Sequence, residues 1–131
     1  MSQQNVEVVR AAFESWNAGD MEALREPLAP EVTLRPVEDW PEPGPYEGRD
    51  AVMRWLGQLR DTWDADALEA TSDFIDATDR VIVRFTWRGV GHGPQSDMEF
   101  TGVWTVRKGK VRGIEFFWDH AEALEAAGLR E

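Results

Sequence analysis

The sequence predicts an α+β fold in which three helices come first and an antiparallel sheet follows. Two observations support this prediction. Apolar residues recur every three or four positions near the start of the chain and again over residues 52–63, which is the period of an amphipathic helix. After Asp64 the pattern changes to alternation, which is typical of strands with one buried face. We therefore expect a sheet that wraps around the helices and encloses the core.

The first helix carries Val6, Val9, Phe13 and Trp16 on one face. It is expected to end at residues 17–19, because the glycine there can take the left-handed conformation that stops a helix. A second, short helix is predicted over residues 21–28, with an aspartate before it as N-cap and prolines at its end.

Gly48 and Asp50 introduce a third helix. The apolar side of this helix is formed by Val52, Trp55, Leu56, Leu59 and Trp63. Before it, a strand over residues 32–36 leads into a segment with four prolines between Pro36 and Pro45. Such a segment can hold neither a helix nor a central strand, so we expect an irregular loop.

Four strands are predicted over residues 68–76, 80–90, 97–107 and 110–118. The connections between them are short, so neighbours in the chain should pair antiparallel in a meander. A short helix follows the last strand. One inward face of this sheet is strongly aromatic. Its members are Val81, Val83, Phe85, Trp87, Met98, Phe100, Gly102, Trp104, Ile114, Phe116 and Trp118.

The opposite face of the sheet mixes threonines, paired charges and a few apolar groups. It comprises Arg84, Thr86, Arg88, Glu99, Thr101, Val103, Thr105, Glu115 and Phe117. A surface of this kind suits packing against a second sheet, so we expect a homodimer through it. Exposure of the face to solvent is the alternative.

Composition limits the classes of function. A length of 131 residues fits one domain over residues 1–131. The net charge of -11 would repel nucleic acids and anionic membranes. The absence of cysteine excludes disulfides, thiolate metal sites and cysteine nucleophiles. With no signal-like start and no apolar run of about 18 residues, we expect a cytoplasmic protein. The two histidines lie far apart, so we expect no metal, and no cofactor is predicted.

Asp119 and His120 stand together where the last strand ends. Asp119 with Glu122 three residues later is close to a capping box, in which each side chain satisfies a free backbone amide at a helix start. Capping therefore explains the aspartate, and Gly128 would close the same helix. We expect His120 to be a surface residue, since adjacent side chains point in different directions.

Four stretches of the chain together resemble a known family. They are VRAAFESWNAGDMEAL, EGRDAVMRWL, GHGPQSDMEFTGVWTVRKGKV and FFWDHAEALEAAGL, and they resemble the SnoaL-like polyketide cyclases of the NTF2-like superfamily, which also includes ketosteroid isomerase and limonene epoxide hydrolase. The resemblance covers about residues 6–129. It implies an NTF2-like cone with helices on one side of a deep pocket, a strongly bent antiparallel sheet on the other, and dimerisation through the outer sheet face.

Enzymes of the superfamily place acids in an apolar cavity, which tunes a carboxyl pKa for general acid or base work. In our alignment the isomerase's base falls at Pro36, and its two oxyanion-hole residues fall at Gly102 and Ala12. The His and Asp of the SnoaL-type cyclase fall at Gly102 and Phe116. None of these four positions can transfer a proton in this chain.

The inward positions instead offer an aromatic surface for a flat apolar ligand, with indole N–H groups to orient it. The predicted ligand-binding residues are Trp16, Trp40, Trp55, Phe85, Phe100, Gly102, Trp104, Phe116 and Trp118. Gly102 leaves room beside the aromatic groups, or else permits the sheet to bend. A filled core is the alternative, since a domain of this size buries aromatic residues in any case.

Polar candidates are few. Glu38 and Asp39 in the proline-rich loop, or His92 in a later connection, could remove a proton next to a carbonyl. The alternative is that all three are solvated loop residues. Arg35 and Tyr46 could bind a ligand oxygen. Two hypotheses result: an isomerase or cyclase that acts on a hydrophobic cyclic carbonyl compound, or a non-catalytic protein that binds an apolar metabolite.

Overall fold

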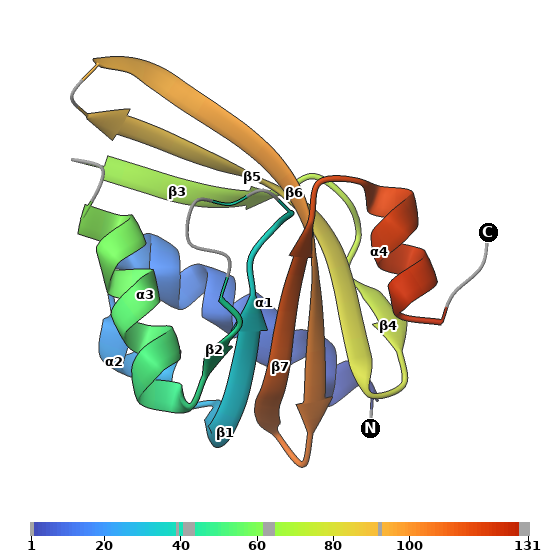
Figure 1. Ribbon diagram of the computed structural model, residues 1–131. Coiled ribbons are helices and arrows are strands. Elements are labelled where there is room, and N and C mark those ends of the chain that lie inside the picture. Colours follow the sequence, from blue (N-terminus) through green and yellow to red (C-terminus); the bar gives the residue numbers. More distant parts are fainter. Residues whose placement is uncertain (1, 39, 41–43, 62–64, 92, 129–131) are drawn as a thin grey trace.

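The computed structural model of the protein describes residues 2–38, 40, 44–61, 65–91 and 93–128 (Figure 1). The first half of the chain forms α1 (Ser2–Ala18), α2 (Met21–Arg25), β1 (Leu28–Arg35), β2 (Tyr46–Glu47) and α3 (Arg49–Asp61). The second half forms β3 (Ala65–Ala70), β4 (Ile75–Ala77), β5 (Arg80–Gly91), β6 (Gly93–Arg107), β7 (Lys110–Phe117) and α4 (His120–Ala126). The α+β class and the short C-terminal helix are confirmed.

The strands form a seven-stranded sheet with the order β2-β1-β7-β6-β5-β3, and β4 also pairs with β5. The predicted antiparallel meander is present from β3 through β5 and β6 to β7. The sheet as a whole is mixed, however, because β1 runs parallel to β7. Short connections predict pairing only between neighbours in the chain, and this pair joins segments about 80 residues apart.

Two boundaries differ from the prediction. The second helix ends at Arg25, and Leu28 and Pro30 belong to β1, which begins four residues earlier than expected. Pro30 is tolerated there because the pairing of β1 with β7 shifts register between Leu28 and Thr33. The predicted strand over residues 68–76 is interrupted between β3 and β4, where Thr71 N donates to Arg84 O at 2.7 Å. Trp63 lies outside the described residues.

The main core fills the concave side of the sheet, against α1 and α3 (Figure 1). A second, smaller core lies on the other side, where Ala123 and Ala127 at the C-terminal helix pack against Ile82 and Val103. Thr101 and Val103, two residues of the face that we expect to pack against a second sheet, are buried within the chain itself. No described helix is long and apolar enough to span a membrane.

Candidate functional site

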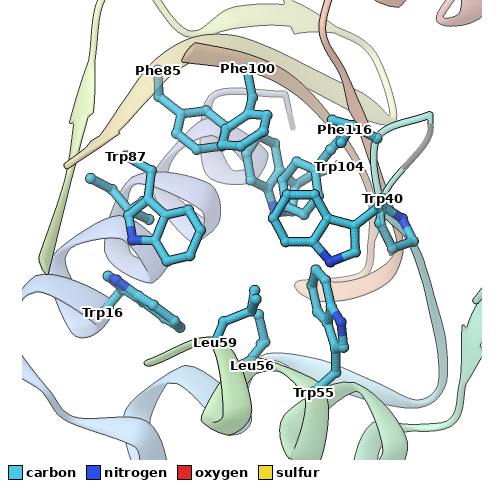
Figure 2. Close-up of a pocket in the computed structure, with 13 residues that line it drawn as sticks. Trp16, Trp40, Trp55, Leu56, Leu59, Phe85, Trp87, Phe100, Trp104 and Phe116 are labelled. Carbon is cyan, nitrogen blue, oxygen red and sulfur yellow. The ribbon is translucent and has the colours of Figure 1, made fainter. Parts of the chain in front are cut away.

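An apolar pocket lies between the concave face of the sheet and the helices α1 and α3 (Figure 2). Its volume is about 90 Å³, and it is partly open to solvent. Its walls are aliphatic or aromatic, and none of the described side chains that line it can titrate near neutral pH. They are Trp16, Pro36, Val37, Trp40, Trp55, Leu56, Leu59, Leu68, Phe85, Trp87, Phe100, Trp104 and Phe116.

The period of each element explains how these side chains converge. Trp16 is on the same face of α1 as Val9 and Phe13, which are buried in the core. On α3, Leu59 follows Leu56 by three residues and Trp55 by four, so these side chains lie on its inner face. On the strands the same result comes from alternation, because every second residue of β5 and β6 points into the cone.

Aromatic rings in edge-to-face and tilted contacts form one end of the pocket. The ring of Phe85 lies 5.2 Å from that of Phe13, 5.6 Å from that of Phe100 and 5.9 Å from that of Phe116, measured between centroids. At the opposite end Trp40 meets Trp55 at 6.3 Å. Pairs of this kind are worth about 0.5–1.5 kcal/mol beyond their buried area. The aromatic side chains around the pocket therefore hold one another in place, in addition to the backbone that carries them.

Most of the predicted ligand residues lie in this wall. The structure brings together Trp16, Trp40, Trp55, Phe85, Phe100, Trp104 and Phe116. Figure 2 shows these rings grouped around one space. Pro36, the aligned position of the isomerase's base, also lines the pocket, whereas Ala12 does not. That the wall binds a ligand stays a prediction.

Gly102 and Trp118 do not line the pocket, and the prediction for both needs correction. A Cβ atom at Gly102 would lie 2.5 Å from Cη2 and Cζ3 of Trp104. The space beside this glycine is therefore filled by the Trp104 indole, and no ligand could use it. Trp118 is 45% exposed and stacks on Phe100 at 5.0 Å. Its Nε1 donates to the backbone oxygen of Glu38 at 3.0 Å, so it ties the proline-rich loop to the sheet.

Of the three candidate acids and bases, Glu38 lies in the described part of the chain, where its side chain is exposed and does not line the pocket. Asp39 and His92 lie outside the described residues. Arg35 pairs with Glu115, with 3.6 Å between Nε and Oε2. Tyr46 stacks on Trp55 with 5.2 Å between ring centroids, so it supports the wall from behind.

The Asp119–His120 pair lies on the outer side of the sheet. Asp119 caps α4, since its Oδ1 accepts from Ala121 N at 3.0 Å. His120 is half-buried rather than a surface residue, because its Nδ1 lies 3.1 Å from the hydroxyl of Thr101, a fully buried side chain. Arg84 Nη1 donates to the same hydroxyl at 2.8 Å. The pair therefore anchors α4 and takes no part in the pocket.

Sequence reasoning missed Asp66, which stands immediately behind the wall. Only 3% of its side chain is exposed, and its Oδ2 accepts from Trp16 Nε1 and from Trp87 Nε1, both at 2.7 Å. A usable signal was present: Asp66 is two residues before Leu68, so extending the alternation backward would have placed it on the inward face. The Trp16 N–H group, one of the indole donors that could orient a ligand, is therefore bonded to Asp66.

Comparisons with known proteins agree with this geometry. An NTF2-like protein of unknown function from Burkholderia pseudomallei is 24% identical, with a TM-score of 0.77, over 93% of this chain and 95% of its own. TerC, co-crystallised with polyporic acid, is 22% identical, with a TM-score of 0.77, over 95% of this chain and 98% of its own. A protein from Jannaschia sp. described as a SnoaL-like polyketide cyclase is 20% identical, with a TM-score of 0.76, over 88% of this chain and 85% of its own.

These likenesses identify the fold as NTF2-like. The model of the SnoaL-like domain matches residues 9–114, and the chain therefore belongs to the SnoaL-like domain family. The resemblance seen in the sequence is thus confirmed. A comparison with curated proteins found no match.

Proposed function

We propose that this SnoaL-like protein binds a small, flat, apolar molecule in the aromatic pocket. The observation that carries the proposal is the chemistry of the wall, which among the described residues contains only aliphatic and aromatic side chains. Burial of an apolar ring against such a wall is favourable because it removes apolar surface from water.

The size of the pocket limits the ligand. Its volume of about 90 Å³ is below that of the apolar cavity of about 150 Å³ that holds benzene in an engineered protein. It is also well below the ~300–1,000 Å³ of pockets for drug-sized molecules. We therefore expect the interior to hold no more than one aromatic ring, with the rest of the ligand extending through the open side.

A second candidate is an isomerase or cyclase that acts on a hydrophobic cyclic carbonyl compound. Membership of the SnoaL-like family supports it, as does the neighbour described as a polyketide cyclase. Its proton acceptor would be Glu38, Asp39 or His92. The aligned catalytic positions are occupied by residues that cannot transfer a proton, and this favours the binding function over the enzyme. These residues are Ala12, Pro36, Gly102 and Phe116. Solvent-deuterium exchange next to the carbonyl of 1-tetralone, catalysed by the protein, would favour the enzyme.

Naphthalene titration tests the binding proposal, with tryptophan fluorescence as the signal. Leu59→Trp puts a bulky indole into the space that naphthalene would occupy, so the affinity for naphthalene should fall about tenfold or more. Gln58→Trp is the matched control, because Gln58 is exposed on the same helix and does not line this pocket. Its affinity should equal that of the wild type. A wild-type protein that does not bind naphthalene, or equal binding by both variants, would contradict the proposal.

We also propose that the protein forms a homodimer through the outer sheet face. Support comes from the half-buried and exposed residues of that face that α4 leaves uncovered, such as Thr86 and Glu99. On this face Arg84 and Glu99 form an ion pair, with 3.3 Å between Nε and Oε2, so these two charges neutralise each other. Paired charges of this kind are compatible with a polar, two-fold interface.

A further inference from the structure

Among the described residues, Asp66 at the start of β3 is a buried acidic group next to the pocket. Its side chain is 3% exposed, and one carboxylate oxygen, Oδ2, accepts two hydrogen bonds from indole nitrogens. Both donors, Trp16 and Trp87, line the pocket. A buried carboxylate is costly unless it is paired and hydrogen-bonded, and here each bond is short, as expected when the acceptor is charged.

A cation completes the arrangement around the carboxylate. Arg60 Nη1 lies 3.8 Å from Asp66 Oδ1 and donates to the backbone oxygen of Trp16 at 2.8 Å. Its guanidinium carbon also lies 4.9 Å from the centre of the Trp16 ring. Asp66 therefore joins four elements at one point: α1 through Trp16, α3 through Arg60, β5 through Trp87, and its own strand β3.

The direction of these bonds decides what the wall shows to a ligand. Figure 2 shows the nitrogen atoms of Trp16 and Trp87 on the same side, away from the space that the labelled rings surround, with the carbocyclic rings toward that space. Both N–H groups are already engaged by Asp66. Indoles rotate about two side-chain torsions, so without a fixed acceptor their N–H groups would be free to seek other partners.

We infer that Asp66 is a positioning residue of the pocket, which holds the Trp16 and Trp87 indoles so that this wall presents only carbon to the ligand. This inference rests on the proposed binding function, and it assigns the hydrocarbon part of the ligand to the Trp16–Trp87 side. Asp66 does not line the pocket itself and acts through the two indoles.

Two substitutions separate positioning from charge. Because both indoles bond to the same oxygen, the side-chain oxygen of Asp66→Asn, with its two lone pairs, can accept both bonds without the charge. Asp66→Leu has a similar shape but no acceptor. The matched control is Glu69→Leu, which removes an acid from the same strand at a side chain that is 59% exposed.

The first measurement is the NMR spectrum of the indole Nε1–H groups, assigned with Trp16→Phe and Trp87→Phe. We expect the Trp16 and Trp87 protons to exchange slowly with solvent in the wild type and in Asp66→Asn. In Asp66→Leu both resonances should shift and exchange faster. Fast exchange of both protons in the wild type or in Asp66→Asn overturns the inference, so the test holds even if Asp66→Leu does not fold.

The second measurement is naphthalene affinity. Asp66→Asn and Glu69→Leu should bind within about threefold of the wild type, and Asp66→Leu about tenfold more weakly, as loss of two hydrogen bonds implies. If Asp66→Asn and Asp66→Leu weaken naphthalene binding equally, the charge of Asp66 matters rather than the positioned indoles, and the inference is overturned. If the wild type binds no naphthalene, the proposed function fails, while the indole spectra still decide the role of Asp66.

Discussion

At the scale of single residues, a glycine makes room for one of the tryptophans that line the pocket. The Trp104 ring lies over the backbone of Gly102, in the space that any side chain there would need. Trp104 is 6% exposed and packs 6.0 Å from the ring of Phe116, measured between centroids. The absence of a Cβ atom therefore serves packing: it allows the indole to fill the sheet side of the cone, and the pocket is smaller as a result.

Gly102→Ala should destabilise the protein, because the added methyl group would lie 2.5 Å from the Trp104 ring and the ring must move. Overpacking of this kind costs about 1–3 kcal/mol in the free energy of unfolding. Urea denaturation measures the change.

Gly113→Ala is the matched control on the neighbouring strand, since the nearest atoms to its Cβ would be 3.8 Å away. We expect a change of less than about 1 kcal/mol there. Similar losses for the two variants would show that the Trp104 ring is not held against Gly102.

At the scale of elements, short polar contacts fix helices that have little buried surface of their own. Asp20 caps α2 by accepting from Ala23 N at 3.1 Å, and Asp119 caps α4 in the same way. The helix α2 is only five residues long, and Arg25 at its end donates to Asp50 of α3 at 2.8 Å. This contact connects the two helices on the surface of the molecule.

The Arg25–Asp50 contact predicts a pH dependence. The hydrogen bond and charge of Arg25 hold the pKa of Asp50 below its ordinary value of 3.8, with smaller contributions from Arg49 and Arg54. A carboxylate with a lowered pKa stabilises the folded state above the pKa of the unfolded chain. That contribution is lost as the pH falls through the lower, folded value.

NMR titration of the Asp50 carboxyl carbon measures this pKa. Arg25→Gln should raise it toward 3.8, and Arg54→Gln, which removes the most minor contribution, should raise it less. An equal effect of the two substitutions would contradict the role given to Arg25.

At the scale of the whole molecule, the sheet has a different partner on each side. Its concave side holds the main core and the pocket, against α1 and α3. On the outer side α4 covers Ile82 and Val103, which limits the surface left for another chain. A dimer through this face would therefore be built around the helix and would use the uncovered parts of β5 and β6.

Sedimentation equilibrium tests the dimer. The wild type should have twice the chain mass of 14.9 kDa. Thr86→Arg puts a long cation on the uncovered part of the outer face, so it should shift the equilibrium toward the monomer while the circular dichroism spectrum stays unchanged. A wild-type protein that sediments as a monomer would contradict the proposed interface.

Much of the fold was predictable because it depends on local pattern. The helical period of Val9, Phe13 and Trp16 and the alternation along β5 and β6 identify which side chains face inward. The same patterns identified most of the aromatic residues that line the pocket. Gly102 and Trp118 were misplaced because a pattern assigns a face but does not say which neighbour occupies the space on it.

The sequence by itself determined the helices, the meander, the aromatic inner face and the cap of the last helix, since each depends on residues a few positions apart. Only the tertiary structure decided the parallel pairing of β1 with β7, the burial of Thr101 beneath α4 and the Asp66 cluster. Trp16 and Asp66 are 50 residues apart, and Trp87 is another 21 further on. Contacts at such separations are fixed by how the elements pack, which no local spacing records.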